Sequence, residues 1–443
     1  MLNNQVPKAD GPSYRGWMID APPAQAAFDI EIRPIGEHEI TTWDRALMRG
    51  FLSPHEGDGT EVRHRQFVPG RWLAAVDHTA GGAFVGTYRS YDLELTLPGG
   101  AAVPVHGITG VSVAATHRRR GLLSRMLNGD LAAARERGSV AAVLIAAEYP
   151  IYGRFGFGPA TRMAGLTVDV PRSGGLRSGL RTPVGGRIDF ATPEEVRKLG
   201  PELYDRWRLT QPGAMSRPAA NWAMDTGEVV LPARGWKEPF FAVHRDAAGV
   251  VTGLAVYRVD DKWIGMAPDS TLKVMDFLAL DRPTANALWR LLFAVDWVQR
   301  IEVEDIGPDD PLPLLLANPR AATPHVSQTD FTWLRLLNLP AAFAARRYAG
   351  PGRMVLAVTD PHGWTSGNWL LETASDGTGR CTPTELPTDL TLGVSELSTL
   401  YLGTEAASRL LAAGLIAEDT PGAAARLDHL LHTPMRAWNT LTI

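Results

Sequence analysis

Cysteine is almost absent from this chain, since Cys381 is the single one among 443 residues. One thiol excludes an internal disulfide framework and is typical of a reducing compartment. No apolar run approaches the roughly 20 residues of a membrane-spanning helix, and residues 1–23 lack the apolar core of a signal peptide. The net charge of −4 gives no global basic field of the kind that favours nucleic acid. These absences predict a cytoplasmic protein that binds neither membranes nor nucleic acid.

The length of the chain exceeds that of one ordinary domain, and we expect two or three. An apolar share of 45% and a charged share of 21% are typical of a globular protein. The order of strand-like and helix-like segments predicts a mixed α/β (α+β) fold with three units after an irregular leader. The leader covers residues 1–28, and the units cover residues 29–165, 166–325 and 326–443.

The first unit combines strand-like alternation with helical periodicity. Its strand candidates are residues 30–34, 71–76, 83–97, 108–114 and 140–147, and its helix candidates are residues 37–51 and 121–137. A strand, a glycine-containing turn and a helix therefore follow one another at residues 108–137. We expect a compact α/β domain that ends near residue 165.

The second unit repeats this order more faintly. Its helix candidates are residues 193–208 and 283–296, and its strand candidates are residues 240–244, 252–259 and 271–280. The turn at residues 278–283 has no glycine and one arginine, so a true repeat would be degenerate. The alternative is that any two α/β domains share a strand, a loop and a helix. In the third unit, a strand at residues 331–336, later strands and short helices predict an α+β domain.

The turn at residues 114–121 carries the strongest functional signal. It contains Arg118, Arg119, Arg120 and Gly121, and it stands between a strand with Val111 and Val113 and a helix that begins near Leu122. Such a turn directs main-chain N–H groups to one point at the positive end of a helix dipole, where a pyrophosphate fits. A solvated basic run or a nucleic-acid patch is the alternative, but the glycine and the flanking elements favour phosphate binding.

The spacing Arg118-x-x-Gly121 after Val111-x-Val113 is similar to the acetyl-CoA signature of the GNAT N-acetyltransferases. The usual Gly or Ala two places after the glycine is Leu123 here. The wider sequence resembles the Eis (enhanced intracellular survival) acetyltransferases. The segments that carry this resemblance are residues 116–123, 151–161, 204–208, 333–335 and 380–384. The resemblance implies an active GNAT domain, a second inactive GNAT-like domain, a C-terminal domain like sterol carrier proteins, and a hexamer.

The resemblance also implies acetyl-CoA as cosubstrate and residues that serve it. The residues that would bind the cofactor are Val111, Val113, Arg118, Arg119, Gly121 and Leu122. Tyr152 would be the general acid, and the terminal carboxylate of Ile443 would be a base or an electrostatic aid. An α-carboxyl has a pKa of about 3.3–3.7, and a primary alkyl amine has one of about 10.4. We therefore favour the electrostatic role for Ile443.

The acceptor side of this chain departs from relatives that acetylate aminoglycosides. Thr442 stands at an acidic penultimate position, and Ile145 replaces a histidine. Ser53 stands at another acidic position, with Glu56 and Asp58 nearby. These changes predict a less acidic and more apolar pocket. Glu148 either faces solvent or attracts a cation, and Trp207 either lines the pocket or packs in the core.

Three functions remain open at this point. The first is acetylation of a primary amine of a small molecule, such as an antibiotic or another natural product, by direct attack in a ternary complex. The second is acetylation of protein lysines, and the third is a non-enzymatic acetyl-CoA sensor or apolar-ligand binder. No metal is expected, because His429 and His432 lack a third ligand in the sequence.

Overall fold

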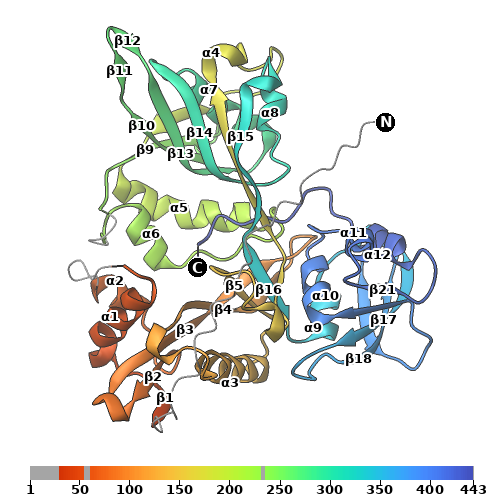
Figure 1. Cartoon of the computed structure of the whole chain (residues 1–443). Helices are drawn as coiled ribbons and strands as arrows, with labels where there is room; N and C mark the ends of the chain where they lie inside the picture. The colour runs from red at the N-terminus through yellow and green to blue at the C-terminus, as the bar shows by residue number, and fades with distance from the viewer. Residues whose placement is uncertain (1–28, 54–59, 231–234, 443) are drawn as a thin grey trace, which may run out of the picture.

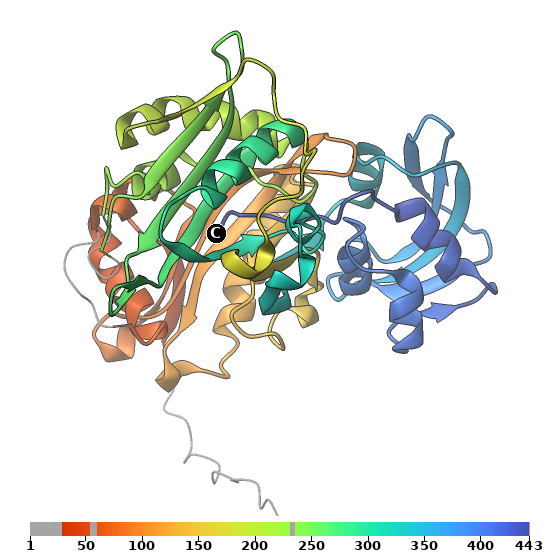
Figure 2. The same cartoon turned by 90° about the horizontal axis from the view of Figure 1, so that it is seen from above.

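Three β-sheets organise the computed structural model, which describes residues 29–53, 60–230 and 235–442 (Figure 1). The expected leader and Ile443 lie outside these residues. The first two sheets face each other, and the third lies to one side of them. The C-terminal segment enters the space between the first two sheets (Figure 2). Within the described ranges, no helix is long and apolar enough to cross a membrane.

The first sheet has the order β1-β2-β3-β4-β5-β16-β6. Its strands are β1 (Ile30–Pro34), β2 (Trp72–Asp77), β3 (Ala83–Thr96), β4 (Ala102–Val113), β5 (Ala141–Ile145), β6 (Gly158–Pro159) and β16 (Thr332–Leu336). Its helices are α1 (Ile40–Gly50), α2 (Thr60–Gln66) and α3 (Leu122–Glu136). Strands β1 to β4 pair antiparallel, whereas β4 and β5 are parallel neighbours joined through α3. The expected strands and helices of this unit are present with small shifts at most ends, but β4 begins six residues earlier than expected and α2 was not expected.

The second sheet has the order β15-β7-β14-β13-β10-β9-β8. Its strands are β7 (Arg162–Asp169), β8 (Arg187–Phe190), β9 (Phe240–Arg245), β10 (Val251–Asp260), β13 (Ser270–Ala279), β14 (Val298–Ile306) and β15 (Ala322–Asp330). The helices around it are α4 (Val170–Ser173), α5 (Pro193–Arg208), α6 (Ala219–Asp225), α7 (Arg282–Phe293) and α8 (Leu312–Leu315). A separate hairpin joins β11 (Trp263–Ile264) to β12 (Ala267–Pro268). Here too a parallel pair, β13 and β14, is joined through a helix.

The third sheet has the order β19-β18-β17-β20-β21. Its strands are β17 (Gly352–Thr359), β18 (Gly367–Thr373), β19 (Gly379–Pro383), β20 (Leu390–Gly393) and β21 (Ala417–Glu418). The accompanying helices are α9 (Leu339–Ala345), α10 (Val394–Leu400), α11 (Ala407–Ala412) and α12 (Ala423–Leu431). Cys381 is buried in the core of this unit, and burial raises the pKa of its thiol to about 12. The thiol therefore has little thiolate character at neutral pH.

One expected strand belongs to a different unit from the one the sequence suggests. Residues 331–336 were expected in the third unit, but β16 pairs antiparallel with β5 and completes the first sheet. Leu334 and Leu336 are fully buried there. Strand β7 begins inside the range expected for the first unit, yet it pairs with β14 and β15. Local sequence determines that such segments are strands, but the partner strand is decided by contacts between residues far apart in the chain.

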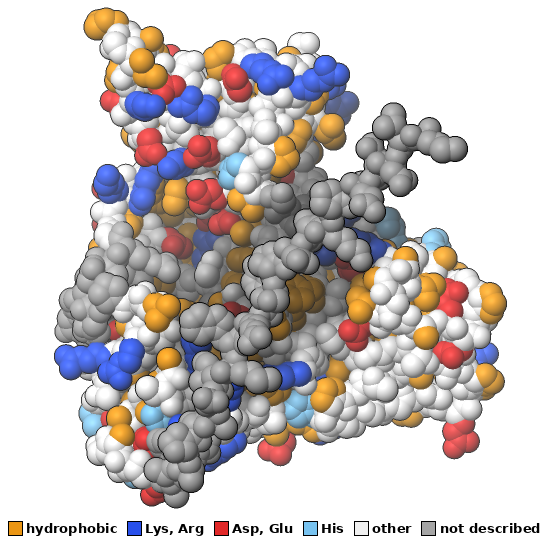
Figure 3. Space-filling model, in the orientation of Figure 1, with side chains coloured by type: hydrophobic (Ala, Val, Ile, Leu, Met, Phe, Trp, Pro, Cys, Tyr) orange, Lys and Arg blue, Asp and Glu red, His pale blue; other side chains and the backbone are white. Residues whose placement is uncertain are grey.

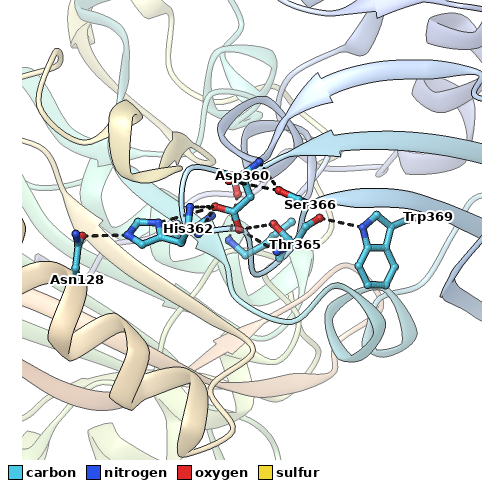
Figure 4. Close-up of polar contacts among 9 residues, drawn as sticks. Asn128, Asp360, His362, Thr365, Ser366 and Trp369 are labelled. Atoms are coloured by element: carbon cyan, nitrogen blue, oxygen red, sulfur yellow. Dashed lines mark hydrogen bonds and ion pairs between the residues drawn. The ribbon is translucent and has the colours of Figure 1, made fainter.

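The third unit is fastened to the first by a buried polar network (Figure 4). Arg335 of β16 forms an ion pair of 2.7 Å with Asp360, and both side chains are fully buried. His362 reaches back to α3, where its Nε2 lies 3.0 Å from Asn128 Oδ1. Thr365 donates both its amide and its hydroxyl to the second Asp360 oxygen. The buried ion pair joins β16 to the third unit, and removing one member of it would leave an uncompensated charge.

Candidate active site

A gap opens where β4 and β5 stop pairing. Their parallel register ends at Gly107 opposite Val143, although β4 continues to Val113 and β5 to Ile145. A bulge at Gly110, whose φ is 61°, shifts the register between β4 and β3. In the described part of the chain, no strand pairs with residues 108–113 on the side of β5. Main-chain groups around Val111 and Val113 are therefore available to an extended ligand that carries amides.

The arginine turn lies at the end of this gap. A 3-10 turn at Ala115–His117 leads to Arg118 and Arg119, which are both exposed, and then to Gly121 at the N-cap of α3. Arg119 and Gly121 have φ values of 61° and 71°. No side chain caps α3, and a Cβ on Gly121 would meet nothing within 4 Å. An uncapped helix N-terminus fits a pyrophosphate when it has open space beside it and two exposed arginines nearby.

The base of the turn is held by two buried side chains that the sequence analysis did not single out. His117 Nε2 lies 3.0 Å from Asp77 Oδ2 at the end of β2. The other Asp77 oxygen accepts hydrogen bonds from the amide and the hydroxyl of Thr79. The Thr79 and His117 hydrogen bonds hold the pKa of Asp77 below its usual range. Leu122 is also buried and packs with Ala75 and Val85 beneath the turn, so its side chain anchors the helix start.

Tyr152 lies in the same apolar cluster as Val111, Val113 and Leu123. It precedes a 3-10 turn at Gly153–Phe155, and its ring contacts Phe157 at a centroid distance of 6.1 Å. The side chain is 8% exposed, and within the described ranges its hydroxyl has no hydrogen-bond partner. Burial, with a smaller contribution from Glu148, raises the pKa of Tyr152 to about 12. The phenol is therefore protonated at neutral pH and free to donate a hydrogen bond.

A cavity of about 1240 Å³ lies between the first and second sheets. Figure 3 shows the molecule hollowed in this region, with acidic side chains along the upper side of the hollow. Thr109 and Gly110 line the cavity, so it meets the gap between β4 and β5 at the bulge. Ser53 and Thr442, two of the expected pocket residues, line it as well. The structure thus brings together residues from both ends of the chain.

The other expected pocket residues lie elsewhere. Trp207 is 7% exposed and packs against Tyr204 and Trp438, at ring distances of 5.4 Å and 5.9 Å, without lining the cavity. Ile145 ends β5 opposite Thr332 of β16. Glu148 is exposed and does not line the cavity, and its charge contributes to the raised pKa of Tyr152. Ile443, the expected base or electrostatic aid, lies outside the described part of the chain.

Three stretches match known domain families. Residues 31–160 and 213–336 match two acetyltransferase (GNAT) families, and residues 339–440 match the sterol carrier protein domain. An uncharacterized N-acetyltransferase of Streptomyces avermitilis is 47% identical over 93% of this chain and 98% of its own. N-acetyltransferase Eis of Mycobacterium tuberculosis is 37% identical over 86% of this chain and 91% of its own. The chain belongs to the Eis family of GNAT N-acetyltransferases.

The whole architecture of this Eis-family acetyltransferase is shared with a solved structure. Eis1 of Mycobacterium abscessus superposes with a TM-score of 0.80 at 29% identity, over 93% of this chain and 100% of that one. The expected fold is confirmed, since two GNAT domains precede a domain like sterol carrier proteins. The gap, the arginine turn and Tyr152 all belong to the first GNAT domain, and the cavity lies between the two GNAT domains.

The Eis-family cavity contains aspartates that the sequence analysis missed. Asp225, Asp276, Asp305 and Asp310 line it from the second GNAT domain. Burial raises the pKa of Asp225 to about 6 and also raises those of Asp305 and Asp310. The expectation of a less acidic pocket therefore does not describe this wall. The sequence of β13 indicates one of these aspartates, because Asp276 interrupts the alternating apolar face formed by Leu272, Val274 and Leu278.

One of these aspartates is already neutralised by a buried arginine. Arg217 donates to Asp276 at 2.7 Å, and its guanidinium lies over the rings of Tyr204 and Trp222 at 4.3 Å and 4.8 Å. Its Nη2 also reaches the Thr440 hydroxyl at 3.3 Å, which ties the C-terminal segment to the cavity wall. Asp225 and Asp305 form no ion pair among the described residues. They are therefore the carboxylates available to a cationic ligand.

Proposed function

We propose that this enzyme transfers the acetyl group of acetyl-CoA to a primary amine of a small molecule in a ternary complex. The observation that carries the proposal is that two separate spaces meet at Gly110. Gly110 lies within the gap between β4 and β5, and it also lines the cavity between the GNAT domains. A donor in the gap and an acceptor in the cavity would meet without a covalent enzyme intermediate.

The donor would be held by main-chain groups near Val111 and Val113 and by the arginine turn. The N–H groups that follow Gly121, including that of Leu122, would face the pyrophosphate, and Arg118 and Arg119 would add positive charge. Bound acetyl-CoA would supply a thioester, whose carbonyl carbon is open to attack. In the balanced reaction an N–C bond forms and the C–S bond breaks. The ammonium loses two protons, of which the departing sulfur receives one and solvent receives the other.

Two proton transfers are required of the protein. A primary alkyl amine with a pKa of about 10.4 is neutral in about one molecule in 2,500 at pH 7, a cost of about 4.6 kcal/mol. The terminal carboxylate of Ile443 is proposed to favour loss of that proton through its charge. Tyr152 is proposed to donate its phenolic proton, or a hydrogen bond, to the departing sulfur. Because its pKa of about 12 exceeds the roughly 8.5 of a thiol, hydrogen bonding accounts for more of its effect than full transfer.

The aspartates of the second GNAT domain support an amine as acceptor. Asp225 and Asp305 would attract an ammonium group into the cavity before the proton is lost. A lysine of a folded protein is the second candidate, but the cavity lies between two domains and is bordered by the C-terminal segment. A compact molecule therefore fits this site better than a protein surface. The cytoplasmic location and the hexamer remain predictions, and the mass of the purified assembly would test the hexamer.

The test is thiol release from acetyl-CoA with a panel of small amines and a lysine-rich protein. We expect release to require an amine and to be faster with small molecules, with acetylated product identified by mass spectrometry. A variant with two residues added after Ile443 moves the carboxylate and is expected to turn over more slowly. Acetyl-CoA binding without turnover of any amine would contradict the proposed function. Unimpaired turnover by the extended variant would contradict only the role of Ile443.

A further inference from the structure

Arg89 of β3 lines the acceptor cavity, and among the residues that the structure describes no carboxylate pairs with its guanidinium. Its Nη1 donates a hydrogen bond to the neutral amide oxygen of Gln66, at 2.6 Å. Its Nε is buried and has no partner, and across the described residues neither Nε nor Nη2 meets a carboxylate. Asp44 is close enough to affect it, but Asp44 pairs with Arg63 at 2.7 Å. A cation in such a place is costly unless an anion joins it.

Three of the other four arginines that line the cavity form ion pairs with carboxylates of the chain. Arg63 pairs with Asp44 and Arg217 pairs with Asp276, each at 2.7 Å. Arg65 pairs with Glu61 and Glu228, at 2.9 Å and 3.0 Å. Among the described residues Arg258 forms no ion pair, and it donates to the Lys237 carbonyl at 2.6 Å. Arg258 therefore resembles Arg89, since each has one neutral partner and a buried Nε without one, and the position of Arg89 in the cavity is what sets it apart.

Arg89 is also positioned at the point where the donor and acceptor spaces meet. Its main chain pairs with Thr109 of β4, and a Cβ added to Gly110 would lie 3.3 Å from its Cγ. Its guanidinium lies 5.1 Å from the Trp72 ring and 6.0 Å from the Tyr91 ring. These aromatic faces fix the planar group beside the bulge. The side chain therefore cannot leave the reaction point for bulk water without losing both ring contacts.

Burial lowers the pKa of Arg89 to about 10, so the group is still charged at pH 7. A charged guanidinium presents paired N–H donors that match the two oxygens of a carboxylate or a phosphate. The opposite wall carries Asp225 and Asp305, which suit a cation. The cavity therefore has a positive point beside the reaction centre and a negative wall across from it.

We propose that the natural acceptor is an amino compound that also carries an oxyanion, a carboxylate in the simplest case, and that Arg89 binds this oxyanion beside the reacting amine. The inference rests on the proposed function and names its substrate class. An enzyme whose acceptors are polyamines without an anionic group would differ from this one, because Arg89 would repel a second ammonium of the acceptor. Arg89 is a specificity-determining residue in this view.

The experiment compares three amines of similar length, namely γ-aminobutyrate, its primary amide and putrescine. These compounds have flexible chains, so the carboxylate can reach Arg89 although the distance between Arg89 and the reacting amine is not fixed in advance. We expect kcat/KM to be about ten-fold or more higher for γ-aminobutyrate than for the amide, because charge-assisted hydrogen bonds discriminate to this extent. Arg89→Met should abolish the preference and leave the amide within about three-fold, and Arg89→Lys should retain part of it.

The control is Arg65→Gln, which removes the same charge from an arginine that is already paired. It should leave the preference unchanged, and thermal unfolding and CoA binding should show that all variants are folded. Absence of a carboxylate preference in the wild type would overturn the inference. An equal loss on all three amines in Arg89→Met, with a shifted pH profile, would also overturn it and assign Arg89 to amine deprotonation. If no amine is turned over, the proposed function itself fails.

Discussion

The turns that precede α3 and α7 occupy equivalent places in the two GNAT domains, yet their helix starts differ in one decisive feature (Figure 1). Each follows the longer strand of a parallel pair, β4 with β5 and β13 with β14. The N-cap of α3 is Gly121, and no side chain occupies the helix start. The N-cap of α7 is Asp281, whose carboxylate accepts the Thr284 amide at 2.7 Å.

The difference explains why one strand-turn-helix unit suits a phosphate and the other does not. At α7 the position for an anion is already taken by a carboxylate of the chain, and Pro283 removes one N–H donor. The loop after the second parallel strand differs too, because Tyr152 follows β5 whereas Asp310 follows β14. The second GNAT domain has thus kept the fold and contributes aspartates to the cavity instead of a donor site.

The largest effect that would test this asymmetry is expected from Tyr152→Phe. Loss of the phenolic proton should lower kcat about 100-fold or more, while the acetyl-CoA KM stays within about three-fold. Because the pKa of Tyr152 is raised to about 12, deprotonation of this phenol should not lower wild-type kcat up to pH 10. Tyr149→Phe, at an exposed tyrosine three positions earlier, is the matched control. Full activity of Tyr152→Phe would remove Tyr152 from the mechanism.

A second effect should follow when the first turn is given the cap of the second. Gly121→Asp places a carboxylate at the start of α3, and Gly121→Asn adds a neutral side chain of the same shape at the same positive φ. CoA should bind about ten-fold more weakly to the Asp variant than to the Asn variant, because the carboxylate repels phosphate. Titration calorimetry measures this ratio. Equal affinities would show that the uncapped helix start does not hold the pyrophosphate.

A smaller effect should come from the acidic wall of the second domain. With a pKa of about 6, Asp225 is about 90% ionised at pH 7 and about 10% ionised at pH 5. Putrescine stays protonated over this range, so its affinity should fall about ten-fold as the pH falls from 7 to 5. Calorimetry with CoA present measures binding without turnover. Asp225→Asn should bind putrescine weakly at both pH values. If this variant shows the same pH dependence as the wild type, Asp225 is not the group that binds the ammonium.

The smallest effect is expected from Asp281→Ala, which uncaps α7. Loss of the cap should lower the free energy of unfolding by about 1 kcal/mol, as measured in urea. Turnover should not change, and calorimetry should still find one CoA per chain, because the second domain has no arginine turn. A second CoA site in this variant would mean that the Asp281 cap is what prevents the second domain from binding CoA.

Much of the first domain could be predicted from local patterns. The strand at residues 30–34 has the expected bounds, and α3 differs from expectation by one residue at each end. The arginine turn and Tyr152 were found because glycine, arginine and aromatic residues stand at short, fixed spacings. The roles of Arg89 and Asp225 could not be predicted, because neither residue belongs to a motif with its neighbours in the sequence. Trp207 was left between pocket and core, and the structure places it in the core.

The sequence by itself determined most strands and helices of the first domain, the arginine turn before α3, and that the protein is an Eis-family acetyltransferase. These properties depend on neighbours within a few residues or on motifs along the chain. Tertiary structure alone decided that β16 completes the first sheet, that Ser53 and Thr442 share one cavity, and that Arg89 has no anion beside it. Each of these depends on contacts between residues far apart in the chain, where long-range packing and charge pairing select among arrangements that the local sequence allows equally.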